Sequence, residues 1–421
     1  MKTAVKDFKM TELGPVPKDW EVKRLGEVGE PLMCKRVLKS QTSDSGDVPF
    51  YKIGTFGGEA DSFISQELFD SFRRQYSYPK KGDVLISAAG TIGRSVVFDG
   101  KDAYFQDSNI VWIGNDEAVV SNEYLRWCYG TVKWHTEDGG TVSRLYNNNL
   151  RETLIPVPPL PEQRKIAAAL SDVDEMIAAL EKLIEKKRKI KTGAMQRLLT
   201  GKTRLPGFKG AWVEKRLGEA FEFHSNNTFS RASMIEERGQ IYNIHYGDVL
   251  IRYGAVLDCN KTAIPSLDDA ASSVCKRDFL KDGDVIIADT AEDETVGKAV
   301  EVINVGDRLI ASGLHTIFLR PKEGTFALGW LGYYVNSTAF HDQLLPLITG
   351  IKVSSISKGS LMDTVLRCPP TFAEQKAIAK VLGDMDEEIA ALEAELAKTR
   401  QLKQGMMQEL LTGKVRLVQG G

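Results

Sequence analysis

The sequence has 421 residues, 42% of them hydrophobic and 27% charged, which is enough to bury a sizeable core and suggests two to four domains. The formal net charge of −2 excludes a basic field over the whole molecule, so any contact with nucleic acid must use local basic patches. No window approaches the roughly 18 apolar residues of a membrane span, and the five scattered cysteines form no Cys-x-x-Cys pair, so we expect a cytoplasmic protein with no disulfide framework, zinc site or membrane attachment.

The first globular segment is expected over residues 1–158 and opens with "WEVKRLGEV" at Trp20. Within it, "FRRQYSYPKKGD" interleaves aromatic residues with Arg73 and Arg74, a pattern that suits a nucleic-acid groove. An apolar strand, "DVLIS", then precedes the glycine-containing loop "AAGTIGR". Glycine lets backbone approach a phosphate closely, so Thr91 and Arg94 are candidate DNA contacts. The alternative is a plain strand-connecting turn.

A polar loop, "GGTVSRLYNNNL", closes this segment before a proline-containing stretch. Its Arg144 and Asn147 could bind phosphate oxygens or base edges. It could equally be a polar loop without a ligand.

A long helix is predicted over residues 159–201, ending at Leu-Leu-Thr-Gly, where Gly201 stands at a C-cap position. Its apolar residues step by 4, 3, 4, 3, 4 and form a coiled-coil seam: Ile166, Leu170, Val173, Ile177, Leu180 and Ile184. About 37 helical residues would be roughly 55 Å long. The basic run "EKKRKIKTGAMQR" near its end is interpreted as a solvated face or a partner-docking surface rather than a DNA contact.

The second globular segment is expected over residues 202–370 and begins with a similar opening, "WVEKRLGEA", at Trp212. "DGDVIIA" resembles "KGDVLIS" of the first segment, and Lys298 follows Gly297 as Arg94 follows Gly93. Candidate DNA contacts here also include His245 and Arg252 in "YNIHYGDVLIRYG", and Lys352 and Lys358 in the loop "TGIKVSSISKGSL".

A second helix is predicted over residues 371–413, followed by a tail at 414–421. Shifting the chain by 212 residues aligns 162–205 with 374–417, and 26 of these 44 positions are identical, which indicates an internal duplication. The same steps define a second seam: Ile378, Leu382, Met385, Ile389, Leu392 and Leu396. The two helices are expected to pair as an antiparallel coiled coil related by a pseudo-twofold axis. The alternative is a homodimeric coiled coil.

"GPVPKDWEVKRLGE", "PPLPEQRKIAAALSDVDEMI" and "LPGFKGAW", within two cycles of globular segment and helix, resemble the specificity subunits of type I restriction-modification systems over nearly the full chain. The resemblance implies an α+β fold with two α/β target recognition domains, each followed by a repeated helix. It also implies a subunit that reads a bipartite, asymmetric site on double-stranded DNA and docks two methyltransferase subunits and, through them, restriction subunits. In that family S-adenosylmethionine and ATP lie on these partners, so no cofactor is expected on this chain.

Catalytic motifs are missing from the sequence. It has no G-x-x-x-x-G-K-[ST] loop, no glycine-rich dinucleotide turn and no Cys/His cluster, and its five histidines are more typical of packing or surface positions. We therefore expect a non-catalytic chain. Two alternatives are a coiled-coil scaffold without a DNA role and an enzyme that acts alone; steep salt dependence of DNA binding would distinguish the first, and methyl transfer or ATP turnover by the isolated chain the second.

Overall fold

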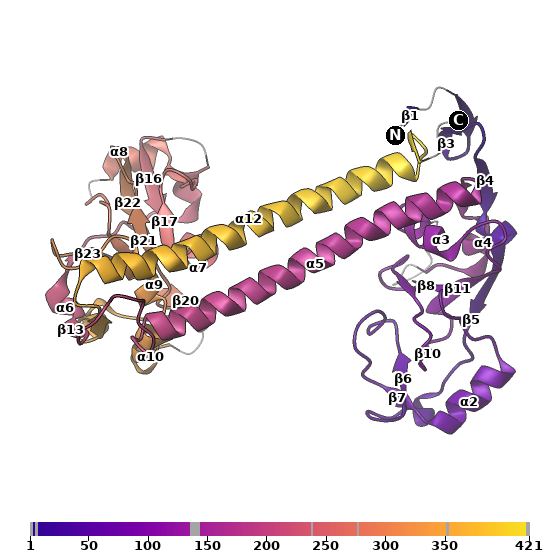
Figure 1. The fold of residues 1–421 in the computed structure, drawn as a ribbon, viewed down its shortest axis with the longest axis horizontal. Helices are drawn as coiled ribbons and strands as arrows, with labels where there is room; N and C mark the ends of the chain where they lie inside the picture. The colour runs from indigo at the N-terminus through magenta and orange to yellow at the C-terminus, as the bar shows by residue number, and fades with distance from the viewer. Residues whose placement is uncertain are drawn as a thin grey trace. The chain divides into compact units, whose positions relative to one another are not determined.

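The computed structural model describes residues 3–4, 7–134, 144–236, 239–275, 278–350 and 353–417. The chain folds into two compact units, one formed by Met1–Glu181 with Ala394–Gly421 and the other by Lys182–Glu393. We call them unit 1 and unit 2. Each unit holds one globular domain and half of each of two long helices, α5 (Leu160–Leu198) and α12 (Phe372–Leu410) (Figure 1).

Unit 1 is built on a four-stranded antiparallel sheet. Its order is β5 (Gly29–Met33), β11 (Ile110–Asn115), β8 (Val84–Ser87) and β9 (Ser95–Val97). A second sheet contains β10 (Tyr104–Phe105), β6 (Val48–Tyr51) and β7 (Phe63–Ile64), and four helices surround the sheets: α1 (Leu25–Val28), α2 (Gln66–Gln75), α3 (Asn122–Tyr129) and α4 (Asn147–Glu152). All four residues of β8 are buried, as a central strand requires.

Unit 2 repeats this sheet and extends it by one parallel strand. Its order is β14 (Phe221–His224), β23 (Thr316–Pro321), β19 (Val285–Ala288), β21 (Ala299–Ile303) and β17 (Val256–Asp258). A second sheet contains β15 (Met234–Ile235), β18 (Ser266–Leu267), β16 (Ile241–Ile244) and β22 (Leu309–Ser312), and the helices are α6 (Leu217–Ala220), α7 (Tyr246–Ile251), α8 (Asp269–Val274), α9 (Trp330–Val335), α10 (Thr338–Leu344) and α11 (Lys358–Met362).

Further short strand pairs complete each unit, and one pair in each unit contains the strand that leads into a long helix. In unit 1, β4 (Glu21–Arg24) pairs with β12 (Leu154–Val157), and β2 (Phe8–Thr11) forms a hairpin with β3 (Gly14–Pro17). In unit 2, β13 (Val213–Arg216) pairs with β25 (Val365–Cys368), and β20 (Thr290–Ala291) with β24 (Ser354–Ser355). Short 3-10 turns lie at Lys39–Gln41, Arg231–Ser233 and Leu345–Leu347.

Helices α5 and α12 pair antiparallel within each unit. In unit 2, Lys187 contacts Glu388 (2.6 Å) and Lys191 contacts Asp386. The residue numbers of the partners on α12 decrease as those on α5 increase, so the two helices run in opposite directions. Each helix stops before a glycine with a left-handed backbone, Gly201 (φ +70°) or Gly413 (φ +71°), which confirms the predicted stop signals. No described helix is long and apolar enough to cross a membrane.

The predicted seam residues of α5 and α12 are removed from solvent to differing degrees. The members near each helix start, Ile166, Leu170, Ile378, Leu382 and Met385, pack against the globular cores. Buried members are Ile166, Leu170, Leu180, Ile184, Ile378, Leu382 and Ile389, and half-buried members are Val173, Ile177, Met385, Leu392 and Leu396.

The Glu-Gln pair at the start of each long helix has the same two contacts in both units. Gln163 accepts a hydrogen bond from the backbone N–H of Ser121 (2.9 Å), and Gln375 accepts one from Ala327 (2.7 Å). The preceding glutamates are buried, and each binds an arginine that follows the other long helix. The repeated motif therefore anchors each helix start to its own globular domain and to the end of the neighbouring helix.

Two segments far apart in sequence meet in unit 1. Strand β1 (Thr3–Ala4) pairs antiparallel with β26 (Val415–Arg416), which lies beside the start of α5 because Arg416 binds Glu162. Arg416 donates to Glu162 Oε1 and Oε2 (both 2.6 Å). In unit 2 the corresponding pair is Arg204 with Glu374. There Arg204 belongs to the continuous loop that connects α5 to β13.

Candidate nucleic-acid interface

The central strands of the two units match residue by residue through their hydrogen-bonding register. At the end of β8, Ser87 lies opposite Ile110 of β11. At the end of β19, Ala288 lies opposite Thr316 of β23. The loops that leave these strand ends can therefore be compared position by position.

Just beyond these strand ends, Asn109 and His315 occupy the same place. The backbone N–H of Ala88 donates to Asn109 O (2.8 Å), and the N–H of Asp289 donates to His315 O (3.1 Å). The glycine loops match as well, because Gly93 and Gly297 donate to the residues at the ends of β8 and β19. This register supports the correspondence of Arg94 with Lys298 that the sequence suggested.

A third loop joins the same corner in each unit. Leu145 N donates to Ala88 O (2.8 Å) in unit 1, and Ile356 N donates to Asp289 O (2.8 Å) in unit 2. Three loops far apart in sequence therefore meet at one end of each central sheet. We call these places corner 1, formed in unit 1 by residues 88–94, 106–109 and 144–149, and corner 2, formed in unit 2 by residues 289–298, 313–315 and 353–358.

Arg144 lies at the centre of corner 1. Its Nη2 donates to Ser108 O (3.2 Å) and to Asn109 Oδ1 (2.9 Å), which orients the guanidinium while most of its five N–H donors stay available. A cavity of about 470 Å³ opens beside it. The cavity is lined by Met33, Ser108, Arg144, Leu145, Tyr146, Asn147 and Asn148.

Thr91 and Arg94 lie exposed on the neighbouring loop of corner 1. The Ser87 hydroxyl shapes this loop, because it accepts from Arg94 N (3.0 Å) and donates to Thr91 O (2.5 Å). Gly93 has φ +81°, and a Cβ there would come within 2.1 Å of the Trp134 indole nitrogen. Only glycine fits this turn, which presents the Arg94 side chain to solvent.

Arg73 and Arg74 lie on α2 and do not line this cavity. Arg73 pairs with Asp102 (3.2 Å) and lies over the Tyr78 ring at 5.2 Å. Arg74 donates from Nε to the backbone oxygen of Asp70 (3.0 Å). Both belong to a surface of unit 1 carried by a different element from the corner loops.

In corner 2 the residue corresponding to Asn109 is His315, which has a strained backbone with φ +54°. Its side chain is 49% exposed, and its Nδ1 lies 3.4 Å from Asp289 Oδ1 and 3.4 Å from Thr290 Oγ1. Left-handed non-glycine residues cluster at functional sites, and the matching loop of corner 1 contains another, Ser108 (φ +58°). An imidazole held in this way can exchange hydrogen bonds with a base edge.

His245 has a supporting position rather than an exposed one. It is the N-cap of α7, and its Nδ1 accepts from Gly247 N (3.2 Å). Its ring is buried, and this burial, together with nearby Arg231, lowers the pKa of His245 below its usual value. A neutral, buried imidazole cannot act as a charged phosphate contact.

Lys298 corresponds to Arg94 in the register, but its side chain points inward. Its ammonium donates to Leu250 O (2.7 Å), and burial lowers the pKa of this lysine. The shared Gly-cation pattern therefore has an exposed cation in unit 1 and a half-buried one in unit 2.

The remaining predicted contacts of unit 2 lie at different places. Arg252 forms two hydrogen bonds with Glu236 (3.2 and 3.0 Å). Lys358, at the start of α11, donates to His224 O (3.3 Å). Lys352 lies outside the described residues.

Sequence reasoning missed Asn109, Tyr146 and His315. Tyr146 is half exposed beside Asn147 and lines the corner 1 cavity. Its place in "RLYNNN" was a usable signal, since exposed aromatic residues among amides suit a base-stacking surface. Asn109 and His315 had none, because their equivalence depends on strand register.

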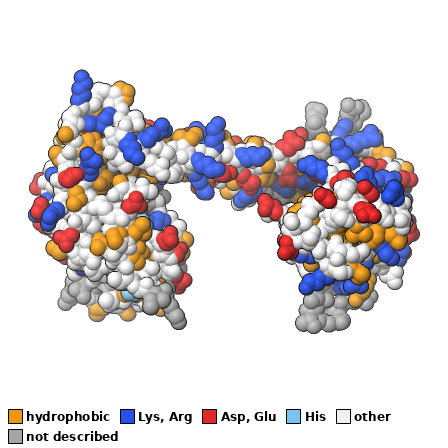
Figure 2. Space-filling model, turned by 90° about the horizontal axis from the view of Figure 1, so that it is seen from below, with side chains coloured by type: hydrophobic (Ala, Val, Ile, Leu, Met, Phe, Trp, Pro, Cys, Tyr) orange, Lys and Arg blue, Asp and Glu red, His pale blue; other side chains and the backbone are white. Residues whose placement is uncertain are grey.

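No group of three or more His, Cys, Asp or Glu side chains among the described residues could hold a metal ion. All five cysteines are buried, and burial raises the pKa of the Cys34 and Cys128 thiols to about 12, so neither thiol provides a nucleophile near neutral pH. Lys and Arg side chains are interspersed with acidic ones on the face drawn in Figure 2. The corners offer hydrogen-bond donors and acceptors at the surface of each unit.

Residues 17–192 match the family model for the type I restriction modification DNA specificity domain. A putative type I restriction enzyme specificity subunit of Haemophilus influenzae is 57% identical over 156 residues, which are 37% of this chain and 40% of that protein. The putative type I restriction enzyme MjaX specificity subunit of Methanocaldococcus jannaschii is 25% identical over 427 residues, covering 98% of this chain and 97% of that one.

Solved structures show the same fold. The S subunit of a type I restriction-modification system from M. genitalium aligns with a TM-score of 0.56 and 14% identity, covering 96% of this chain and 97% of that one. A chain from a structure concerned with complex assembly and conformational transition of the type I system aligns with a TM-score of 0.56 and 19% identity, covering 95% and 99%.

Proposed function

Because this chain belongs to the specificity subunits of type I restriction-modification systems, we propose that corner 1 and corner 2 each read one half of a bipartite, asymmetric DNA site. Recognition of DNA is the role of this family, and the alternative of a scaffold without a DNA role is not favoured. The assignment of that role to the two corners is our proposal.

The observation that carries the proposal is that one frame holds two different sets of side chains. Corner 1 presents Arg144 and Asn147 around Asn109, whereas corner 2 presents Asp289 and Thr290 around His315. Arginine and asparagine suit guanine and adenine edges, while a carboxylate suits the cytosine amino group. Equivalent frames with different donors and acceptors would read unlike half-sites.

We further propose that the chain is non-catalytic and docks two adenine methyltransferase subunits and, through them, restriction subunits. S-adenosylmethionine and ATP would then lie on those partners. The duplicated helices support this arrangement, because two copies of one docking surface suit two copies of one partner.

The decisive experiment is single-molecule sequencing of host DNA with and without this gene, scoring N6-methyladenine in every context. Loss of one asymmetric motif with a fixed gap, methylated on both strands, is the expected result. Exchange of residues 1–160 for those of another specificity subunit should change one half of the motif only. If no modified motif disappears, the chain is not the reader.

A point substitution tests corner 1 directly. Arg144→Ala should weaken binding of the cognate duplex by about 10- to 100-fold, the cost of about 1–3 kcal/mol for a lost base contact. Arg74→Ala removes the same charge from α2 and is the matched control, with an expected effect below about threefold. Equal losses in both variants would show that the two arginines add only general positive charge.

A further inference from the structure

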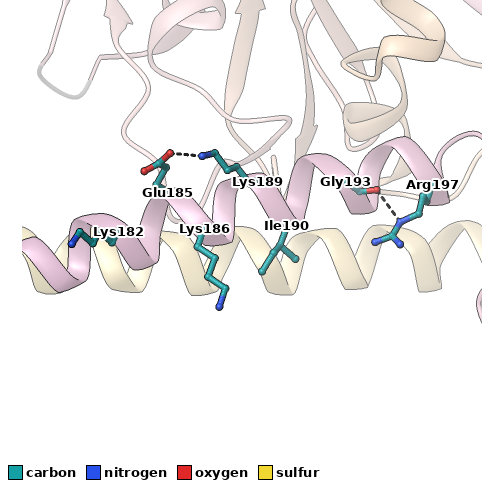
Figure 3. Close-up of a pocket in the computed structure, with 7 residues that line it drawn as sticks. All are labelled: Lys182, Glu185, Lys186, Lys189, Ile190, Gly193 and Arg197. Carbon is teal, nitrogen blue, oxygen red and sulfur yellow. Dashed lines mark hydrogen bonds and ion pairs between the residues drawn. The ribbon is translucent and has the colours of Figure 1, made fainter.

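A groove of about 480 Å³ runs along the outer face of α5 in unit 2, away from the seam with α12 (Figure 3). All of its lining residues come from four turns of this one helix, so its long direction follows the helix axis. A rod-shaped partner fits such a groove better than a compact ligand. The lining residues are Lys182, Glu185, Lys186, Lys189, Ile190, Gly193 and Arg197.

The floor of the groove is apolar. Ile190 is 45% exposed, and Leu183, one heptad earlier on the same face, is 38% exposed. Gly193 lies one turn after Ile190, and a Cβ there would meet nothing within 4 Å, so the glycine leaves open space on the surface. Exposed apolar residues at heptad spacing beside a side-chain-free position are typical of a helix face that packs against another helix.

The rim of the groove is basic. Lys182 and Lys186 lie farther than 4.0 Å from every carboxylate in the part of the chain that the structure describes, whereas Lys189 pairs with Glu185, the one acid of the lining. Arg197 donates to Gly193 O (3.3 Å) with part of its guanidinium. Lys and Arg side chains are visible along this stretch of helix in Figure 2. Acidic side chains on a partner would complement this rim.

The internal repeat shows which part of this face recurs. In the repeat alignment, which shifts the chain by 212 residues, Ile190 corresponds to Leu402, which is 55% exposed. Gly193 corresponds to Gly405, where a Cβ would also meet nothing within 4 Å. Ile190 and Gly193 therefore have counterparts in both copies, on α5 within unit 2 and on α12 within unit 1, whereas Leu183 is replaced by Glu395 on α12.

The basic rim does not recur. On α12 the residues corresponding to Lys182, Glu185 and Lys189 are uncharged, Lys186 is matched by a lysine, and Arg197 is matched by an acid. The α5 face has a formal charge of +3 over these five positions, and the α12 face has a charge of zero. The corresponding α12 residues are Ala394, Ala397, Lys398, Gln401 and Glu409.

We propose that these are two docking faces for one kind of partner helix, amphipathic with an acidic flank, and that the α5 face binds it more tightly and with greater salt sensitivity than the α12 face. The inference rests on the proposed function, because it takes the partner to be the methyltransferase subunit. Two identical subunits would then assemble in two unequal steps, with the α5 face filled first at low salt.

Assembly can be followed without DNA by native mass spectrometry and sedimentation of the full chain with its methyltransferase subunit, from about 50 mM to about 300 mM salt. Lys182→Gln/Lys186→Gln should weaken the tighter step by about tenfold at low salt and abolish most of its salt dependence. Arg164→Gln/Lys165→Gln removes two charges from the same helix outside the groove and should change neither step. Ile190→Glu should leave a 1:1 complex that assembles independently of salt, and Leu402→Glu a 1:1 complex that remains salt-sensitive.

Equal salt dependence of the two steps, or two bound subunits in both the Ile190→Glu and the Leu402→Glu chains, would overturn the inference. So would a lysine variant that assembles normally and loses only DNA affinity, since the groove would then be a phosphate contact. If the unaltered chain binds no methyltransferase at all, the partner assignment of the proposed function fails instead.

Discussion

In each unit an equivalent arginine, Arg204 in unit 2 and Arg416 in unit 1, connects the end of one long helix to the adjacent globular domain. We call these two places the joints. The partners of the two arginines differ. In unit 2 the loop after α5 is continuous, and Arg204 reaches the carbonyl oxygens of Gly210 (2.7 Å) and Lys209 (3.2 Å) within it. In unit 1 the segments come from opposite ends of the sequence, and Arg416 binds the Asp19 carboxylate at 2.9 and 2.7 Å. Where no covalent loop positions the backbone, a charged side chain takes its place.

The tryptophan at the unit 1 joint also forms a side-chain hydrogen bond that its counterpart in unit 2 lacks. Trp20 Nε1 donates to Glu162 Oε2 (3.1 Å), whereas Trp212 Nε1 is buried with no hydrogen-bond partner among the described residues. The unit 1 joint also contains the β1–β26 strand pair. A joint between distant segments must offset more chain entropy than a short loop does, and here it contains more directional contacts.

The largest expected effect comes from Arg416→Ala. It leaves the buried carboxylate of Glu162 without its cation, which should destabilise unit 1 by about 3–5 kcal/mol. Arg204→Ala also uncovers a buried glutamate, but the continuous loop keeps Trp212 near its place, so the loss should fall at the lower end of this range. Urea unfolding measures the cost, and amide hydrogen exchange shows where the chain opens.

Hydrogen exchange provides the discriminating result. Arg416→Ala should lose protection across β1, β26 and the Trp20 region, while Arg204→Ala should keep protection at Trp212. Arg416→Lys restores the charge without the two-pronged geometry and should recover part of the stability. Equal loss of protection at the two joints would contradict the comparison.

A second difference lies in the sheets. The register of β19 and β21 places Glu301 opposite Val285, and the register of β8 and β9 places Val97 opposite the equivalent residue, Val84. Glu301 accepts hydrogen bonds from the backbone N–H groups of Gly329 (2.7 Å) and Gly332 at the start of α9, but burial still raises the pKa of its carboxyl to about 7. Unit 2 therefore holds a titratable group where unit 1 holds an apolar one.

The stability of unit 2 should depend on pH through Glu301. Between pH 4.5, the ordinary pKa of the group, and pH 7, the folded chain retains a proton that the unfolded chain has released, so the free energy of unfolding should fall by about 3 kcal/mol and then level off. Urea unfolding at several pH values measures the slope. Glu301→Gln should remove it while Asp83 and Asp284 titrate as before, and an unchanged slope in this variant would exclude Glu301 as its origin.

The sequence predicted the features that depend on local pattern. The heptad steps around Ile166 and Ile378 and the glycine stops at Gly201 and Gly413 are legible because side-chain period and left-handed backbone are properties of neighbouring residues. The pairing of Arg416 with Glu162 and of Arg204 with Glu374 was not predictable from the sequence. Both repeats contain the same glutamate and arginine, and nothing local indicates that each Arg binds the Glu of the other copy.

The sequence predicted some residues of the two corners, such as Arg144 and Asn147, but not Asn109 and His315. Arg144 and Asn147 stand out by residue type, and the structure places them on one cavity. The inward turn of Lys298, which donates to Leu250 O 48 residues away, and the position of His315 beside the β19–β23 pair depend on tertiary contacts, which residue type alone does not encode.

The glycines after the two long helices give a smaller contrast. At Gly413 a Cβ would lie 2.4 Å from Cγ of Pro17, and at Gly201 the nearest atom, in the Trp212 ring, is 3.2 Å away. Both positions have positive φ, so Gly201→Ala should cost about 1 kcal/mol from the backbone alone. Gly413→Ala adds the clash with a rigid ring and should cost about 2–3 kcal/mol in urea unfolding. A larger loss of stability for Gly201→Ala than for Gly413→Ala would show that the unit 2 joint is packed more closely than the unit 1 joint.

The smallest effect is expected where the joint is covalent. Gly207 lies in the loop between Arg204 and Trp212, and a Cβ there would meet nothing within 4 Å. Doubling the length of a flexible loop costs only about 0.6 kcal/mol of closure entropy, so four residues of Gly and Ser inserted after Gly207 should lower the stability of unit 2 by less than about 1 kcal/mol. The same insertion between Pro17 and Trp20 should cost several times more, because it displaces Asp19 from Arg416. If the two insertions prove equally tolerated, the additional contacts of unit 1 do not hold its joint, and the comparison between the units fails at the feature on which it rests.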